Sequence, residues 1–530
     1  MSVLVDRIGR KKYRLLFTGL FAAIAAVIVL ANRILRMSQA QGMRYTMGFG
    51  MEDCLRLVDF RAGMLLILTA LCFFALYRLL FSAFRPERFF TLTAFGFGLL
   101  YLVGLTPLAI PDEVTHFQAI YDLACRLPLC NGIEAAGDFS GFGNHDSVCT
   151  GYLRILRDFG RAAAPADAAV AGGSALSQMW TLVYVAEYIP QIVGVALAML
   201  LGRNMVTAFL LGRLCNLVFY CACLYLAIKR TPRFRLMFGF AGLMPMAIQQ
   251  AASLSYDSFV NALGLLLVAS MLKAIYGEGP LPLGEYLFIL AAAVILTPAK
   301  GIYVVFVLFF FLIPRERFPM KGRSRGFWAA VLLLCCLGFF ALISLPQMLR
   351  ILGQTRPGFE VTGESQNTLA RVLENPMLTV RIFAATFNVY ILDWLGSAIG
   401  TQLGTYAIEL PVWIIPAFAG CMLLAAQSEG HRAPELPRGF RVCCLVCSAL
   451  VIFAFMVTMY FAWISVDDHI IYGVQGRYFT CIIPLLMMAA TGKSLRFELK
   501  NEGRGLSVLV ILLSARTFLE ILSYSMSHTL

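Results

Sequence analysis

Long runs of apolar residues, separated by short polar segments, recur along most of the chain. Many approach the ~20 residues that a helix needs to cross the ~30 Å hydrocarbon core of a bilayer. Lipid leaves only helices or closed barrels as ways to satisfy the backbone, and the short alternating strands of a barrel are absent. The pattern predicts an all-α, polytopic integral membrane protein with about 13 transmembrane helices. These are residues 15–32, 63–82, 89–109, 205–228, 236–252, 258–276, 285–297, 301–314, 327–345, 407–427, 442–463, 477–491 and 506–524.

One further apolar stretch, residues 181–201, decides the topology because Glu187 and Pro190 interrupt it. If this stretch crossed the membrane, three later basic clusters would face outwards, against the positive-inside rule. If it lies along the outer interface, or dips in and returns, those clusters join the basic N-terminus on the cytoplasmic side. We favour the second alternative. The clusters are "KRTPRFR" (229–235), "PRERFPMKGRSR" (314–325) and "KSLRFELK" (493–500).

This topology divides the chain into three regions and leaves two long segments outside the cytoplasm. An N-terminal transmembrane hairpin (1–88) precedes a transmembrane core (89–491), and a basic loop with a last transmembrane helix (492–530) follows. The outer loops 111–204 and 346–406 are too long for simple connections. Loops of this length often carry function.

The composition agrees with a membrane protein, since 60% of residues are hydrophobic and only 14% are charged. The net charge is +13, but the basic residues form short clusters between apolar runs, as topology requires. We therefore expect no nucleic-acid partner. Most of the 15 cysteines lie in or beside apolar runs, where a thiol behaves as a small hydrophobe. Cys125, Cys130 and Cys149 fall in a polar outer loop, so a disulfide among them is an open alternative.

The segment "PDEVTHF" (111–117) follows directly on an apolar run and predicts the start of a helix. On such a helix Asp112, Glu113 and His116 occupy neighbouring positions of one face at the membrane surface. Two interpretations are open. The acids cap the helix and offset its dipole, or the cluster deprotonates a hydroxyl or holds a divalent cation.

Further charged residues lie where apolar runs begin or bend. Arg477, in "QGRYF", enters an apolar run from the outer side, and Lys300, in "TPAKGIY", lies at the bend between two short runs. Either can anchor a helix by snorkelling, but together they suit a phosphate at headgroup depth. Asp257, in "SLSYDSF", caps a helix or contacts substrate. Tyr256 and Gln475, in the same segments, are further candidate substrate contacts.

Four segments resemble, in the same order, the motifs of a bacterial multi-pass membrane protein family of unknown function that is related to the GT-C glycosyltransferases. They are "PDEVTHF", "LMPMAIQQAASLSYDSFVNAL" (243–263), "TPAKGIYVVFVLFFFLIP" and "GVQGRYFTCIIPLL", and the resemblance covers about residues 90–490. It implies a GT-C-like fold whose first large outer loop carries an acidic catalytic motif and interfacial helices. It also implies a sugar donor carried on a polyprenyl phosphate. Asp112 and Glu113 match the acidic motif. In most GT-C enzymes this motif follows the first span, whereas here two extra predicted spans, the hairpin 15–82, come earlier in the chain.

We therefore expect a glycosyltransferase of the bacterial cytoplasmic membrane that transfers a sugar from a polyprenyl-phosphate carrier to a glycan or glycolipid hydroxyl outside. In this hypothesis Asp112 is the base, Glu113 assists or holds a divalent cation, and His116 orients an acid or binds the ion. Arg477 and Lys300 stabilise the departing phosphate. Two alternatives stay open: a polymerase or ligase of surface polysaccharides, and a transporter or flippase of lipid-linked glycans. The sequence shows no matching halves of the kind common in transporters. It also lacks the Walker A and HExxH motifs of ATPases and zinc proteases.

Overall fold

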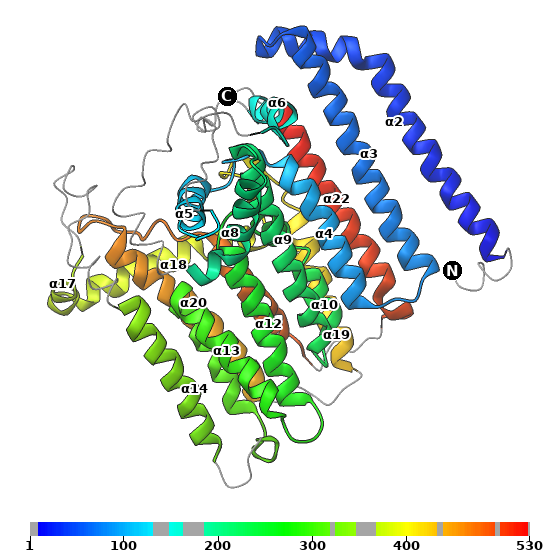
Figure 1. Cartoon of the computed structure of the whole chain (residues 1–530). Helices are drawn as coiled ribbons and strands as arrows, with labels where there is room; N and C mark the ends of the chain where they lie inside the picture. Colours follow the sequence, from blue (N-terminus) through cyan, green and yellow to red (C-terminus); the bar gives the residue numbers. More distant parts are fainter. Residues whose placement is uncertain are drawn as a thin grey trace.

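The computed structural model describes residues 9–130, 148–162, 185–318, 324–345, 367–431, 438–492 and 499–527. Within these ranges the protein is almost entirely helical, and Figure 1 shows most long helices packed side by side. Seven of the described helices are long and apolar enough to cross a membrane. The prediction of an all-α, multi-pass membrane protein is thus confirmed. The count of thirteen spans stays a prediction, since other apolar helices are shorter.

Helices α2 (Arg10–Met47) and α3 (Met51–Phe81) form an antiparallel hairpin at one edge of the molecule (Figure 1). Both continue well beyond the predicted spans. α2 alone has 38 residues, which at 1.5 Å per residue is about 57 Å and exceeds the ~30 Å hydrocarbon core. The extensions pair polar side chains, with Arg36 Nη2 lying 2.7 Å from Asp59 Oδ2. Most of the loop expected between the two spans is therefore helical.

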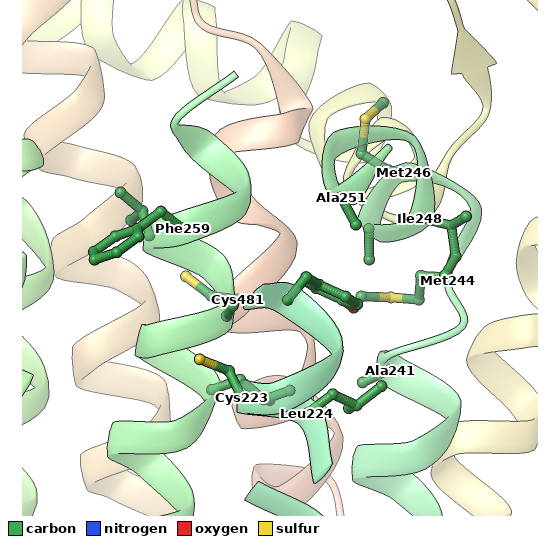
Figure 2. Close-up of a cluster of buried hydrophobic side chains, with 14 of the residues drawn as sticks. Cys223, Leu224, Ala241, Met244, Met246, Ile248, Ala251, Phe259 and Cys481 are labelled. Carbon is green, nitrogen blue, oxygen red and sulfur yellow. The ribbon is translucent and has the colours of Figure 1, made fainter. Parts of the chain in front are cut away.

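Helix α12 (Asp257–Tyr276) is buried along nearly all of its length and packs chiefly against the long helix α9 (Met205–Arg230). Further long helices of the bundle are α4 (Pro86–Gly104), α20 (Arg438–Ala462) and α22 (Arg504–Ser527). Shorter helices are α5 (Glu113–Cys125), α6 (Val148–Asp158), α14 (Arg325–Phe339), α17 (Leu369–Glu374) and α19 (Ile414–His431). Figure 2 shows the apolar packing beside α12, where the labelled side chains are Cys223, Leu224, Ala241, Met244, Met246, Ile248, Ala251, Phe259 and Cys481.

Three apolar stretches of the core are divided into short helices. The predicted span 236–252 is in fact two short helices, α10 (Arg235–Ala241) and α11 (Pro245–Ala251), since Pro245 begins a new helix. α13 (Leu283–Ala299) and the 3₁₀ helix η2 (Gly301–Leu312) meet at Lys300. Their 17 and 12 residues correspond to about 26 Å and 24 Å, which is less than the ~30 Å hydrocarbon core. The 3₁₀ helix η5 (Gly476–Ile482) continues into α21 (Ile483–Ala489).

Helix α8 (Val185–Leu200) covers most of the ambiguous stretch 181–201. Its 16 residues correspond to about 24 Å, which is short for a membrane crossing. Its polar residues Glu187 and Gln191 are fully buried, whereas Ile189 and Val193 are more than half exposed. The polar side chains thus face the protein interior and the apolar ones face outwards, as expected for a helix that contacts lipid. Its length agrees with the interpretation that this stretch does not cross in full.

The outer loop predicted at 346–406 contains a 24-residue apolar helix, α18 (Pro376–Ile399). This helix is not among the spans predicted from the sequence. Its length and composition would suit a span. Along its whole length, however, α18 contacts the segment 460–480. The first turns lie beside the hydroxyl of Tyr460, the middle accepts a hydrogen bond from the N–H of Ile471, and the last turn accepts one from Thr480. Figure 1 shows α18 crossing the long helices rather than running beside them.

Basic side chains gather at the C-terminal ends of α9 and α12. Arg230 and Lys273 both form salt bridges with Glu285, and Arg317 donates to the carbonyl of Ala274 (2.7 Å). The positive-inside rule would place this end in the cytoplasm. The side of the membrane that each end faces stays a prediction.

Candidate functional site

Asp112 and Arg477 form an ion pair although 365 residues separate them in sequence. Asp112 precedes α5 in the left-handed conformation (φ 63°, ψ 5°), which Asp tolerates better than most residues. Arg477 also donates from Nη1 to the carbonyl of Pro111 (3.1 Å). The arginine side chain is 6% exposed and that of Asp112 is 56% exposed. The pair thus has a buried cation and an accessible carboxylate.

Asp257 connects this pair to Lys300. It is the first residue of α12, and its two carboxylate oxygens face different cations. Oδ1 pairs with Lys300 Nζ, and Oδ2 lies 3.5 Å from Arg477 Nε. The side chains of Asp257 and Lys300 are 5% and 10% exposed. Lys300, Asp257, Arg477 and Asp112 therefore form a row of alternating charges, which we call the charged row, and its four formal charges cancel.

Aromatic rings surround the buried end of the charged row. Lys300 Nζ lies 4.1 Å from the ring centroid of Tyr478 and 5.3 Å from that of Tyr256. Tyr478 also stacks on Phe455, with centroids 4.9 Å apart and planes 12° from parallel. Cation–π contacts stabilise an ammonium that burial has stripped of water. Tyr256, a predicted substrate contact, thus lies beside the charged row.

Glu113, expected to assist catalysis or hold a metal ion, is surrounded by hydrogen-bond donors. Arg213 of α9 grips it with two hydrogen bonds of 2.8 and 2.5 Å, and the N–H groups of Leu108 and Leu254 donate to its two oxygens. Both side chains are fully buried. The remaining donors of Arg213 reach the carbonyls of Leu102, Leu105 and Thr106. This saturated pair ties α4, α5, α9 and the start of α12 together.

His116 is buried and faces aromatic side chains. Its Nδ1 lies 2.6 Å from the hydroxyl of Tyr188, and its ring meets Tyr256 edge-on with centroids 5.2 Å apart. Burial lowers the pKa of His116 to about 4, with the positive charge of Arg477 acting in the same direction. The imidazole is therefore neutral at physiological pH.

The three residues expected as possible metal ligands face different partners. Asp112, Glu113 and His116 face Arg477, Arg213 and Tyr188, and the described residues contain no group of three or more His, Cys, Asp or Glu side chains that could hold an ion. The structure also bears on the possible disulfide among Cys125, Cys130 and Cys149. Cys130 is a free, buried thiol, and the side chain of Cys149 lies outside the described residues.

Amide side chains hold the backbone of Arg477 in place. Gln250 Nε2 donates to the carbonyl of Arg477 (3.2 Å), and Asn261 Nδ2 donates to Gln250 Oε1 (2.5 Å). Asn216 Nδ2 donates to the carbonyl of Ser253 (2.7 Å), four residues before Asp257. The predicted contact Gln475 lies two residues before Arg477. Its Oε1 is buried without a hydrogen-bond partner among the described residues.

A small β-hairpin covers one side of the site. Strands β1 (Gln402–Leu403) and β2 (Ile408–Glu409) pair in antiparallel register, and the N–H of Gly404 donates to Gln249 Oε1 (2.7 Å). Tyr406, in the turn, has a positive φ of 67° and is 43% exposed. Burial raises the pKa of its phenol to about 12, and the charges of Arg477, Asp112 and Asp257 also act on it.

The model of the family described as "Predicted membrane protein (DUF2142)" matches residues 173–486, more than half of the chain. The chain belongs to this family. Neither the curated proteins nor the solved structures contain a significant match. The DUF2142 match covers Arg213, Asp257, Lys300 and Arg477, whereas Asp112 lies before it. It supports the resemblance to a membrane family of unknown function, and the relationship to GT-C enzymes stays a prediction.

In this DUF2142 protein the site also contains polar atoms that lack a hydrogen-bond partner within the described residues. Arg477 Nε, Asn261 Oδ1 and Ser258 Oγ are all buried in this way, as is Gln475 Oε1. Buried polar groups are usually paired, so a cluster of unpaired ones points to a ligand or water. The structure thus brings Asp112, Asp257, Lys300 and Arg477 together, with His116 and Tyr256 beside them.

Proposed function

We propose that the protein is a membrane glycosyltransferase that moves a sugar from a polyprenyl-phosphate carrier to an acceptor hydroxyl outside the cytoplasm. The observation that carries this proposal is the charged row. It combines two buried cations, Lys300 and Arg477, with one accessible carboxylate, Asp112. A reaction that releases a phosphate and removes a proton needs these two kinds of group next to each other.

The two cations suit the phosphate of the leaving group. Arg477 offers a guanidinium whose Nη2 would become available when Asp112 is displaced, and Lys300 adds a second positive charge. Both side chains are at least 90% buried, so their interaction with a developing negative charge is weakly screened. Asp257 lies between the two cations and keeps them charged and separated.

Asp112 is the best placed base, because its carboxylate is accessible from water. In the proposed reaction the acceptor oxygen forms a bond to the anomeric carbon and gives its proton to Asp112. The bond between that carbon and the phosphate oxygen breaks, and its electron pair leaves with the lipid phosphate. A single displacement of this kind inverts the configuration at the anomeric carbon.

The ion pair between Asp112 and Arg477 implies an exchange on substrate binding. The donor phosphate would replace the carboxylate as partner of Arg477, and Asp112 would then be free to accept a proton. Neutral His116 and Tyr188 would hold the start of α5 beside the reacting groups through their 2.6 Å hydrogen bond. Transfer outside the cytoplasm follows if the basic end of the bundle faces inwards.

The test is sugar transfer by purified protein in lipid nanodiscs, supplied with radiolabelled undecaprenyl-phosphate sugars and a membrane extract as acceptor. Label should enter the acceptor with wild type and not with Asp112→Asn or Arg477→Ala. Arg36→Gln is a matched control, because Arg36 forms an ion pair in the N-terminal hairpin instead. Equal transfer by all four proteins would contradict the proposal. Movement of intact sugar lipid across a vesicle membrane, without transfer, would indicate the transporter alternative.

A further inference from the structure

The turn of the β-hairpin packs against the loop that carries Asp112. A Cβ placed on Gly404 would lie 3.2 Å from the carbonyl oxygen of Ala109, three residues before Asp112. The N–H of Gly404 is fixed on the other side by Gln249, and the N–H of Leu410 closes the hairpin on the carbonyl of Thr401 (2.8 Å). The hairpin therefore has a defined position beside the acidic loop.

Tyr406 occupies a conformation in this turn that an aromatic residue rarely adopts. Its φ of 67° lies in the left-handed region, where Gly or Asn would be less strained. Strained residues of this kind cluster at ligand-binding sites. The residue is also 43% exposed although the hairpin itself is anchored. Packing alone does not explain an exposed aromatic ring in a strained turn.

The charged row gives the direction in which a substrate would extend. Exposure rises from Lys300 and Arg477, at 10% and 6%, to Asp112 at 56%. A phosphate held by the two cations would leave the next atom, the anomeric carbon, beside Asp112. The rest of the sugar ring would then extend towards the accessible side. Tyr406 is the exposed aromatic residue of the hairpin whose Gly404 lies against the acidic loop, and the charges of Arg477, Asp112 and Asp257 act on its hydroxyl.

We propose that Tyr406 is the platform on which the sugar ring of the donor rests, and that it sets which sugar is transferred. A sugar ring has an apolar C–H face and polar edges, and tyrosine combines an apolar ring with a polar hydroxyl. Its high pKa keeps this hydroxyl neutral and able to donate. This inference rests on the proposed function, because it assumes that a lipid phosphate binds to Arg477 and Lys300.

The test compares two kinds of ligand on the full-length protein in nanodiscs. One is undecaprenyl phosphate without a sugar, and the other is the same lipid carrying glucose, galactose or N-acetylglucosamine. Wild type should bind at least one sugar lipid more tightly than the bare lipid. Tyr406→Ala should weaken the binding of that sugar lipid by about 3- to 10-fold, as expected for one aromatic contact. It should leave the affinity for the bare lipid unchanged. Tyr406→Phe should retain most of the preference.

Two control variants separate this contact from indirect effects. Tyr406→Asn tolerates the positive φ, so it keeps the hairpin conformation while removing the ring, and it should behave as Tyr406→Ala does. Tyr45→Ala removes a tyrosine that is 93% exposed in the N-terminal hairpin, and it should change neither affinity. Equal weakening of both ligands, unchanged binding, or no sugar preference in wild type would overturn the inference. If Arg477→Ala leaves binding of the bare lipid intact, the proposed function fails instead.

Discussion

The carboxylate of Asp112 pairs with the guanidinium of Arg477, so the proposed base is bound to the residue that we propose to bind the phosphate. In the proposed enzyme, this pairing puts an internal anion where the phosphate of the substrate should bind. The two groups can act in the reaction only after the substrate has separated them. This relationship gives the first prediction.

Asp112→Asn should abolish turnover but strengthen the binding of undecaprenyl phosphate. Loss of a general base lowers a rate by roughly 100- to 10,000-fold. Affinity should rise several-fold because no carboxylate competes for Arg477. Asn tolerates the left-handed conformation of this residue, so folding should be preserved. Binding isotherms and transfer rates on the same sample measure both effects. Weaker binding by the variant would show that the carboxylate helps to hold the lipid.

Glu113→Gln should destabilise the protein because it leaves Arg213 buried without a countercharge. Breaking a buried ion pair typically costs ~3–5 kcal/mol. Both side chains are fully buried, so solvent screening does not reduce this cost. Thermal unfolding in detergent should show a lower midpoint, and Glu113→Leu combined with Arg213→Met should recover part of the loss. A Glu113→Gln variant with wild-type stability and no activity would instead indicate a catalytic role.

His116 should make the protein less stable in acid. The pKa of its buried ring is about 4, below the 6.5 of an exposed histidine. As the pH falls from about 6.5 to 4, the unfolded chain takes up a proton that the folded protein refuses, so stability decreases over this window. Above pH 6.5 both states are neutral and the effect vanishes. Unfolding midpoints at pH 7.5 and 5 should therefore differ less for His116→Gln than for wild type. An unchanged difference would argue that the ring is protonated in the folded protein.

The membrane orientation can be checked by cysteine labelling in a cysteine-free background. A cysteine at Asp468, close to α18 and the site, should react with an impermeant reagent from outside intact cells. A cysteine at Glu316, at the basic end, should react only after the cells are broken. The reverse pattern would invert the topology and move the site to the cytoplasm.

The sequence predicted most helices because the need to cross lipid imposes long apolar runs. It missed α18, whose mean hydropathy is the lowest of the seven candidate spans. It also missed the extensions of α2 and α3, since ion pairs such as that of Arg36 with Asp59 stabilise polar helix surfaces without an apolar period. Breaks such as that at Pro245 divided a single predicted span in two.

Within the site, the sequence identified charged residues but not their partners. Asp112 and Glu113 are neighbours in the chain, yet one faces Arg477 and the other Arg213. Asp112 precedes α5 in the left-handed conformation and Glu113 is the first residue of the helix, so the two side chains reach different surroundings. Arg213 could have been found as a lone arginine within an apolar run, which needs a partner. Gln250 and Tyr406 carried no such signal, because their importance depends on the tertiary fold.

The most direct measurement of the central claim is the release of undecaprenyl phosphate from an undecaprenyl-phosphate sugar by the purified protein. The proposed roles of the charged row predict that release is coupled one-to-one to labelling of the acceptor, and that Arg477→Ala and Lys300→Met suppress both products together. A protein that releases no lipid phosphate from any sugar lipid, or releases it equally well without Arg477, would contradict those roles.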